Sequence, residues 1–264
     1  MKDNFIHVCF IIDESGSMSG SESDIIGGFN KTIEEQKAIK DGQCAISFYS
    51  FNDGISERFI GKDVNDVKPL VKGSRFGSHR MFNHPTHVCS ITSATTIDTT
   101  ITEDNDDYLY QYSPGGCTAM NDAIATAINK IGKWLSEMPE EDRPSKNLIV
   151  IMTDGEENSS KEYTLAKVQE MIKHQTEKYD WTFVYMGMDI SNAKAANSLG
   201  IANRSFSTKS SNHLMSNYAN ISNATICYRV ADSDMADLAF TASLDASLTA
   251  MTQDFEDTTG IKIN

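Results

Sequence analysis

Long apolar segments and a secretion signal are both missing from this sequence. No apolar run approaches the ~20 residues that a membrane-spanning helix needs. The N-terminus also lacks a charged region followed by an apolar one, which is the pattern of a signal peptide. We therefore expect a soluble, cytoplasmic protein that has no membrane partner.

Cysteine is scarce as well. Five cysteines are an odd number for a disulfide framework. Cys9 and Cys44 lie inside apolar, strand-like runs, where a reduced thiol packs as a small hydrophobic side chain. This usage indicates a reducing compartment.

Basic residues are too few to balance the acidic ones. The chain has 23 Lys and Arg against 37 Asp and Glu, which gives a formal net charge of −14 at pH 7. Such a charge disfavours phosphate backbones and anionic lipid surfaces, and it favours cations or basic partners. We expect no nucleic-acid partner, and the sequence contains no Gly-rich phosphate loop of the Walker type.

What the sequence does contain is a regular alternation of apolar runs and segments of helical period. This alternation is typical of a parallel sheet that is covered on both faces. Strands are expected at residues 5–12, 44–51, 146–152, 181–187 and 204–207. Helices are expected from Ser23 or Asp24 to the Asp41-Gly42 stop, from the Gly-Gly loop to Pro139, at 164–178 and 191–199, and from about residue 212.

Two features refine the sheet. Asn52-Asp53-Gly54 forms a tight turn into "ISERFI", which predicts an antiparallel edge strand. "KNLIVIM", residues 146–152, is the most hydrophobic run and is expected at the centre. The predicted fold class is α/β, a doubly wound and mostly parallel sheet with one antiparallel edge strand and helices on both faces.

Polar residues follow two of the apolar strands and predict a site. Asp13 and Asp154 each come at the end of such a strand, and Thr118 lies in a Gly-Gly loop just before a long helix. Ligands of open α/β sheets bind beyond the carboxyl ends of the strands, where the strand order reverses. Ser15 and Ser17 follow Asp13 at a spacing of two, so a turn at the intervening glycine can direct both hydroxyls to one ion.

The donor atoms of this site indicate the metal. Carboxylate and hydroxyl oxygens suit a hard divalent cation, Mg²⁺ or Mn²⁺, that keeps some of its waters. Each motif alone has a simpler explanation: Asp-x-Ser-x-Ser as a turn or helix cap, Asp154-Gly155 as a turn, and Thr118 as an N-cap. Their joint position at one predicted edge favours the metal site.

At this point the sequence resembles a family. "DESGSM" matches the D-x-S-x-S motif of von Willebrand factor A (vWA) domains, "GGCTAMNDAI" matches their threonine loop, and "MTDGEEN" matches their aspartate loop, in the same order. The segments "SSKEYTLAKVQEMI" and "WTFVYMGMDISNAKAANSLGI" are similar to small cytoplasmic vWA proteins of bacteria and bacteriophages. The resemblance covers most of residues 3–229.

The resemblance implies a metal-dependent adhesion site, abbreviated MIDAS. Ser15, Ser17 and Thr118 would carry the metal, and Asp13 and Asp154 would contribute directly or through water. In this family one coordination position stays open, and a Glu or Asp carboxylate of a protein partner can fill it.

An insert is the main departure from the family. It covers about residues 72–106 and contains His79, His84, His87 and Cys89. These four side chains could bind a second metal, Zn²⁺, but their spacing is not a standard ligand pattern, and a loop or hairpin is the alternative. The expected division is a vWA domain at 1–231 with this insert, and a C-terminal extension at 232–264.

Other side chains near the motifs allow two interpretations. Met18 and Met120 could form an apolar rim for a partner, or they could pack inside. Glu156 and Glu157 could add negative potential beside the metal, or they could cap the next turn.

Two functions follow from these residues. The first is a metal-dependent protein-binding module, which is not an enzyme. The alternative is a metal-dependent hydrolase or phosphoryl-transfer enzyme that uses the same ion. The sequence lacks an activated nucleophile, and no Lys, Arg or His belongs to the site motifs, so we favour the binding module.

Overall fold

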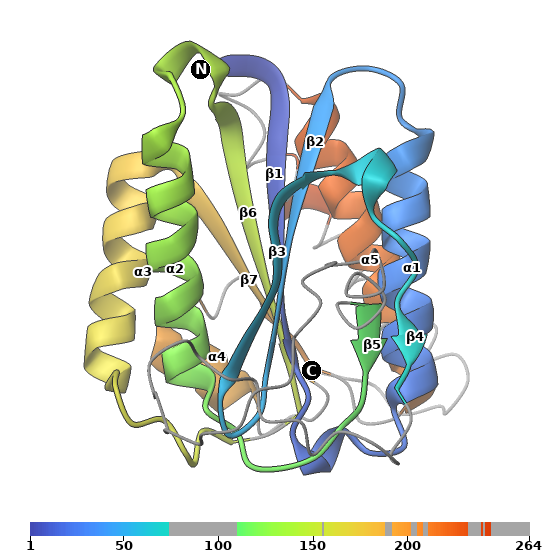
Figure 1. The fold of residues 1–264 in the computed structure, drawn as a ribbon, viewed down its shortest axis with the longest axis vertical. Helices are drawn as coiled ribbons and strands as arrows, with labels where there is room; N and C mark the ends of the chain where they lie inside the picture. Colours follow the sequence, from blue (N-terminus) through green and yellow to red (C-terminus); the bar gives the residue numbers. More distant parts are fainter. Residues whose placement is uncertain are drawn as a thin grey trace, which may run out of the picture.

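The computed structural model describes residues 1–73, 110–154, 156–187, 192–201, 205–207, 211–231, 239 and 241–243. Within this part of the chain, a central sheet lies between two layers of helices (Figure 1). None of the described helices is long and apolar enough to cross a membrane.

The sheet has six strands in the order β3-β2-β1-β6-β7-β8. These strands are β1 (Lys2–Asp13), β2 (Gln43–Phe51), β3 (Ile55–Asp63), β6 (Pro144–Thr153), β7 (Trp181–Gly187) and β8 (Ser205–Ser207). Neighbouring strands are parallel except β2 and β3, so β3 is an antiparallel edge strand, as the turn at residues 52–54 predicts. The hydrophobic run at 146–152 lies in β6, which is at the centre as expected.

Helices cover both faces of the sheet, and this confirms the doubly wound α/β class. They are α1 (Glu22–Ala38), α2 (Met120–Glu137), α3 (Leu165–Tyr179), α4 (Asn192–Leu199) and α5 (Ser211–Val230). In Figure 1, α1 and α5 lie on one side of the sheet, whereas α2 and α3 lie on the other. Short 3₁₀ turns also occur at η1 (Gly16–Met18), η2 (Val64–Asp66) and η5 (Glu140–Asp142).

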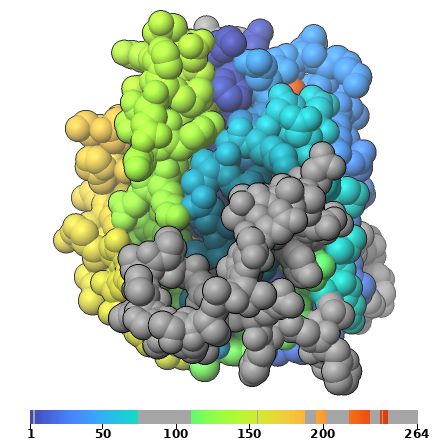
Figure 2. All heavy atoms as spheres, in the orientation of Figure 1, coloured from blue at the N-terminus to red at the C-terminus, as the bar shows by residue number. Residues whose placement is uncertain are grey.

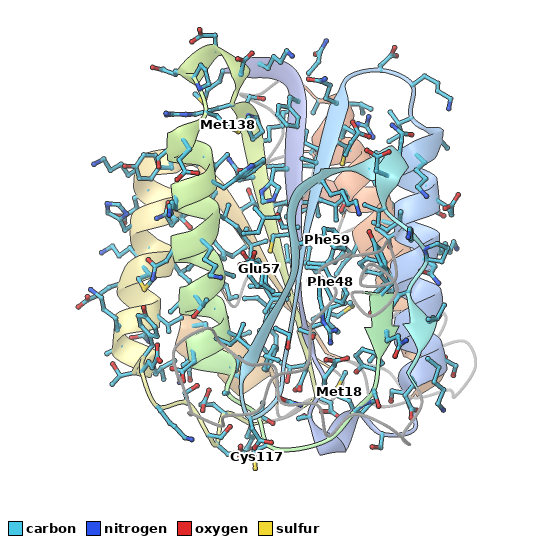
Figure 3. All side chains as sticks on the ribbon, in the orientation of Figure 1. Met18, Phe48, Glu57, Phe59, Cys117 and Met138 are labelled. Atoms are coloured by element: carbon cyan, nitrogen blue, oxygen red, sulfur yellow. The ribbon has the colours of Figure 1, made fainter. Side chains whose placement is uncertain are left out.

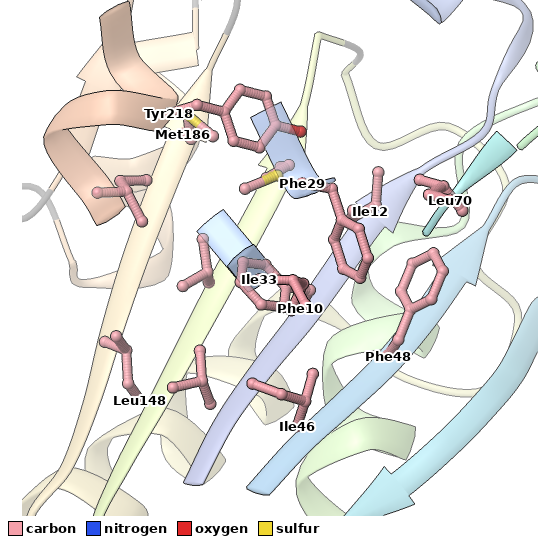
Figure 4. Packing of buried hydrophobic residues seen from close by; sticks show 14 of the residues in the cluster. Phe10, Ile12, Phe29, Ile33, Ile46, Phe48, Leu70, Leu148, Met186 and Tyr218 are labelled. Atoms are coloured by element: carbon pink, nitrogen blue, oxygen red, sulfur yellow. The ribbon is translucent and has the colours of Figure 1, made fainter. Parts of the chain in front are cut away.

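Two hydrophobic cores follow from this arrangement. Alternate residues of β1 point to opposite faces: Phe10 packs on the α1–α5 side and Ile11 on the α2–α3 side. Figure 4 shows the first core, where the rings of Phe10 and Phe48 each lie about 5 Å from Phe29, at 5.3 and 5.2 Å. Because β1 is buried on both faces, its sequence is apolar without interruption.

The strand order reverses between β1 and β6. From β1 the chain continues outward through β2 to β3, and from β6 it continues outward in the other direction through β7 to β8. β1 and β6 are parallel neighbours, with Ile12 opposite Met152. Asp13 ends β1, and Asp154 directly follows β6, so both aspartates lie at the switch point, at the lower edge in Figure 1.

The opposite, amino-terminal edge of the sheet carries two buried cations. Lys146, near the start of β6, donates hydrogen bonds to the carbonyl oxygens of Tyr228 (2.8 Å), Arg229 (3.4 Å) and Ala231. Arg229 in turn donates to the carbonyl oxygens of Gln36 (2.8 Å) and of residues 39, 41 and 42. These contacts satisfy the last carbonyl groups of α5 and α1.

One small element was not predicted from the sequence. β4 (Val71–Lys72) and β5 (Gln111–Tyr112) pair in parallel as a separate two-stranded sheet at the ends of the insert. The rest of the insert, with His79, His84, His87 and Cys89, lies outside the described residues, as does most of the predicted extension at 232–264. The zinc hypothesis and the domain boundary therefore stay predictions.

Candidate metal centre at the switch point

Asp13 is fully buried and is held from three directions. Its Oδ1 accepts a hydrogen bond from the Ser15 amide at 2.6 Å, and its Oδ2 accepts one from the Thr153 hydroxyl, also at 2.6 Å. The Tyr112 hydroxyl donates to the Asp13 carbonyl oxygen at 2.6 Å. The carboxylate therefore has one orientation, and hydrogen bonds occupy part of its acceptor capacity.

Ser15, Ser17 and Asp154 continue the same polar chain. The two serine Oγ atoms are 3.0 Å apart, and the Ser17 hydroxyl donates to Asp154 Oδ1 at 2.6 Å. Neighbouring ligands of an octahedral Mg²⁺, each at about 2.1 Å from the ion, are separated by roughly 3 Å. The spacing of the serine oxygens matches that separation, so the residues present fit a small hard cation.

The positions of Asp13 and Asp154 disfavour the charged form of both carboxyl groups. Burial raises the pKa of Asp13, and the nearby negative charge of Asp154 raises it further, while hydrogen bonds from Thr153 and Ser15 lower it. Burial likewise raises the pKa of Asp154, against a lowering by the Ser17 hydrogen bond. Two desolvated carboxylates of the same sign favour a cation between or beside them.

Thr118 contacts the loop that follows Asp154, and it does so through its main chain. Its amide donates to Asn158 Oδ1 at 2.9 Å, and its carbonyl oxygen accepts from the amides of Asn158 (3.1 Å) and Ser159 (3.3 Å). Within the described residues, no hydrogen bond joins the Thr118 side chain to Asp13, Ser15, Ser17 or Asp154. The structure thus links four of the five predicted residues by side chains, and it ties the fifth to the same loops.

The glycines before Thr118 allow its loop to approach residues 14–17, which we call the serine loop. The Gly16 amide donates to the Gly116 carbonyl oxygen at 3.0 Å, and the Gly115 amide donates to the Glu14 carbonyl oxygen at 2.7 Å. Gly116 has φ +85°, and a Cβ there would collide with the Asp53 carboxylate. Only glycine fits this position without strain.

Two acidic residues that are not predicted ligands fix the aspartate loop. Glu157 accepts from the amides of Asn121 (2.8 Å), Ser159 (3.0 Å) and Ser160 (2.8 Å). Asp122 accepts from the amides of residues 161, 162 and 163 at 2.7–3.0 Å. The capping interpretation of Glu157 is confirmed, and the role of Asp122 had no sequence signal, because its partners lie 39–41 positions away.

The apolar-rim interpretation of Met18 and Met120 is wrong. Met18 is 1% exposed and Met120 is 3% exposed, so both pack in the two cores. Figure 3 places Met18 and Cys117 at the same end of the molecule. Cys117 is exposed, and a hydrogen bond to the Asp53 carboxylate raises the pKa of its thiol, which therefore stays protonated at neutral pH.

The donor set of the site is rich in hydroxyls. No group of three or more His, Cys, Asp or Glu side chains that could hold a metal occurs in the described part of the chain. The site offers two carboxylates and serine hydroxyls instead, which are weak ligands for soft metals and suitable ones for hard cations.

Comparison with known proteins identifies the fold. No protein-family model matches the sequence, and no curated protein matches it either. Proximal thread matrix protein 1 from the mussel byssus, solved with a zinc-occupied MIDAS motif, has a TM-score of 0.52 at 14% identity over 85% of this chain. This chain spans only 47% of that protein's chain.

Two bacterial structures are similar to about the same degree. The vWF domain of the type V pili tip protein Mfa5 from Porphyromonas gingivalis has a TM-score of 0.51 at 12% identity, over 84% of this chain and 95% of that one. The PilB minor pilin from Streptococcus sanguinis has a TM-score of 0.50 at 11% identity, over 83% and 61%. At these identities the likeness concerns the fold alone, and the chain has the α/β fold of vWA domains.

Proposed function

We propose that this chain is a metal-dependent protein-binding module. Ser15, Ser17 and Thr118 supply hydroxyl oxygens to one Mg²⁺ or Mn²⁺, and Asp13 and Asp154 act on the ion directly or through water. A carboxylate from a protein partner completes the coordination.

One observation carries this proposal. Two buried or half-buried carboxylates with raised pKa values meet two serine oxygens 3.0 Å apart, at the point of the sheet where the strand order reverses. The zinc in the MIDAS motif of the mussel protein supports a divalent ion at this place in the fold. Because the oxygen donors here favour harder ions, we propose Mg²⁺ or Mn²⁺.

The partner follows from the charge of the ion and of the chain. A metal that hydroxyls and waters surround stays electrophilic, and an anionic oxygen is its natural further ligand. The net charge of −14 repels an acidic partner, so the contact depends on the cation. We infer that one Asp or Glu of the partner dominates the interface.

The enzyme alternative would need an acid, a base or an activated nucleophile beside the ion. Within the described residues, no His, Lys or Arg side chain hydrogen-bonds to Asp13, Ser15, Ser17 or Asp154. Turnover of a phosphate-ester and nucleotide panel with Mg²⁺ or Mn²⁺, abolished by Asp13→Ala, would restore that alternative.

Calorimetric titration with Mn²⁺ and Mg²⁺ tests the metal site. Wild type should bind one ion weakly, and the Asp13→Ala, Asp154→Ala double variant should release no binding heat. A matched control is the Asp66→Ala, Asp142→Ala double variant, which removes the same charge at two exposed positions outside the site. Equal heats from wild type and the site variant would contradict the assignment.

A pull-down from the native host tests the partner. Binding should require Mg²⁺ or Mn²⁺, disappear with chelator, and fall sharply in Ser15→Ala, Ser17→Ala or Thr118→Ala. A partner that binds equally well with chelator and to Asp13→Ala would show that recognition lies elsewhere in the chain.

A further inference from the structure

We propose that the ion pair of Glu14 and Arg58 is a positioning pair that sets the metal affinity of the site. This inference rests on the proposed function, because it concerns the same metal. Glu14 lies between Asp13 and Ser15 in the sequence, and it is 6% exposed. Its carboxylate Oε2 lies 2.7 Å from Arg58 Nη2.

Glu14 holds the serine loop against three other segments. Its amide donates to the Phe51 carbonyl oxygen at the end of β2 (2.6 Å), and its carbonyl oxygen accepts from the Gly115 amide (2.7 Å). Its Oε1 accepts from the Ser113 amide at 3.1 Å. Both the main chain and the side chain of Glu14 therefore fix the segment that carries the proposed ligands on either side of it.

Arg58 reaches Glu14 because of an irregularity in β3. Phe48 pairs with Phe59, but the next residue of β2, Tyr49, pairs with Glu57, so Arg58 is the extra residue of a β-bulge. A bulge redirects the side chain of its extra residue, and bulges are frequent beside functional sites. Here the Arg58 Nε–H also donates to the Ser50 hydroxyl at 2.8 Å, which leaves the guanidinium one orientation toward Glu14.

The pair can change the metal affinity in two ways, and these predict different directions of change for variants of Glu14 and Arg58. If only its charge mattered, Arg58→Met would leave the Glu14 carboxylate unopposed and strengthen cation binding, whereas Glu14→Gln would weaken it. If the pair positions the serine loop, both substitutions release the loop and both weaken binding. The geometry points to the second case, because the hydrogen bonds of Glu14 and Arg58 join the segment after β1 to β2, to β3 and to the loop before α2.

The experiment is a Mn²⁺ titration of the full chain, with thermal unfolding recorded for each variant. We expect Glu14→Gln and Arg58→Met each to raise the Kd by about tenfold, as loss of a residue that orients metal ligands commonly does. Arg58→Lys keeps the charge but loses the fixed two-sided contact, and we expect it to recover only part of the affinity. Glu14→Gln is nearly isosteric, so it tests the proposal even where Arg58→Met fails to fold.

A matched control lies on the same strand. Glu57, the neighbour of Arg58, pairs with Lys130 of α2 at 2.5 Å, and the two side chains are 36% and 50% exposed. α2 and β3 both reach the surface on the face that Figure 2 shows. Glu57→Gln and Lys130→Met should leave the Mn²⁺ affinity within about twofold of wild type, because surface ion pairs contribute little.

The outcomes separate the two proposals. Opposite shifts in Glu14→Gln and Arg58→Met, or unchanged affinity in both, would overturn the positioning role while the metal site stands. Absence of Mn²⁺ binding in wild type would overturn the proposed function itself, and the positioning role with it.

Discussion

The two edges of the sheet carry charges of opposite sign, and the fold compensates the charges at one edge more completely than at the other. At the amino-terminal edge, Lys146 and Arg229 direct their hydrogen-bond donors at the carbonyl oxygens that end α5 and α1. At the carboxyl-terminal edge, Asp13 and Asp154 receive hydroxyl and amide donors, yet each still has a raised pKa, and Asp154 raises that of Asp13. The fold itself compensates the charges at one edge, and we propose that a cation compensates those at the other.

This difference separates structural from functional burial of charge. Helix C-termini carry partial negative charge, so a buried ammonium or guanidinium there stabilises the fold directly. Two carboxylates close together have no such benefit, and titratable groups with raised pKa values of this kind are frequent at functional sites. The following predictions test that distinction, from the largest expected effect to the smallest.

Removing the ammonium group of Lys146 at the amino-terminal edge should have the largest effect on stability. Lys146→Met leaves the carbonyl oxygens at the end of α5 without their charged donor, and charged hydrogen bonds of this kind predict a loss of about 4 kcal/mol in the free energy of unfolding. Urea denaturation measures this, with the exposed Lys133→Met as control. A loss below about 1 kcal/mol would show that relief of ammonium desolvation offsets the lost contacts.

The Mn²⁺ affinity of Lys146→Met tests whether the two edges of the sheet act independently. Lys146 lies at the other end of β6 from Asp154, so Lys146→Met should bind Mn²⁺ as wild type does wherever it is folded. A large change in affinity would mean that the two edges are coupled through the sheet.

Acidification should destabilise the protein through His7. Burial lowers the pKa of His7 from 6.5 to about 4 in the folded state, where its Nε2 lies 2.7 Å from the Ser47 hydroxyl. The unfolded chain therefore takes up a proton between pH 6.5 and 4 that the folded chain does not, and stability falls across that window. The shift corresponds to about 3 kcal/mol.

The measurement is urea denaturation of wild type and His7→Gln from pH 7 to pH 4. Wild type should lose about 3 kcal/mol more than the variant over this range. His174→Gln, at an exposed position, is the control and should follow wild type. Parallel curves for wild type and His7→Gln would contradict the prediction.

Sequence reasoning located the elements well where periodicity was strong. β7 has the predicted bounds, and β6 and α3 differ from the prediction by one or two residues. Asp13 and Asp154 could be placed at one edge because parallel strands share the position of their carboxyl ends, and that rule needs no knowledge of distant contacts.

The features that sequence reasoning missed depend on contacts between distant residues. Arg58 meets Glu14 across 44 positions, and Lys146 meets Tyr228 across 82. Neither pair has a spacing that a local pattern records. β4 and β5 have two residues each, which is too short for a periodic signal. The sequence left two interpretations of Met18 open, and the 3₁₀ turn after Ser15 decides between them.

At the carboxyl-terminal edge, metal should stabilise the folded state. An ion that binds only the folded chain adds about 2.7 kcal/mol at a concentration of 100 times its Kd. Wild type in Mn²⁺ should gain that amount over wild type in chelator, whereas the Asp13→Asn, Asp154→Asn double variant should gain nothing. Chemical denaturation with and without chelator measures both, and an equal gain in the two proteins would place the ion elsewhere.

The smallest expected effect is a gain in stability, and it comes from removing one charge at the carboxyl-terminal edge. Without metal, Asp154→Asn should be slightly more stable than wild type at neutral pH, because it removes a half-buried charge near Asp13. The asparagine oxygen can still accept the hydrogen bond from Ser17, which Asp154 accepts at 2.6 Å. Since the folded pKa of Asp154 is raised, wild type becomes neutral there on acidification, and the advantage of the variant should shrink as the pH falls through that pKa.

Urea denaturation in chelator at pH 7 and pH 4 tests this sign. The control is Asp66→Asn, an exposed aspartate for which we expect a change within about 0.5 kcal/mol at either pH. A loss of stability in Asp154→Asn without metal would mean that this carboxylate supports the fold as Lys146 does. In that case both edges would bury charge for the same structural reason, and the raised pKa values of Asp13 and Asp154 would no longer favour a cation at the carboxyl-terminal edge.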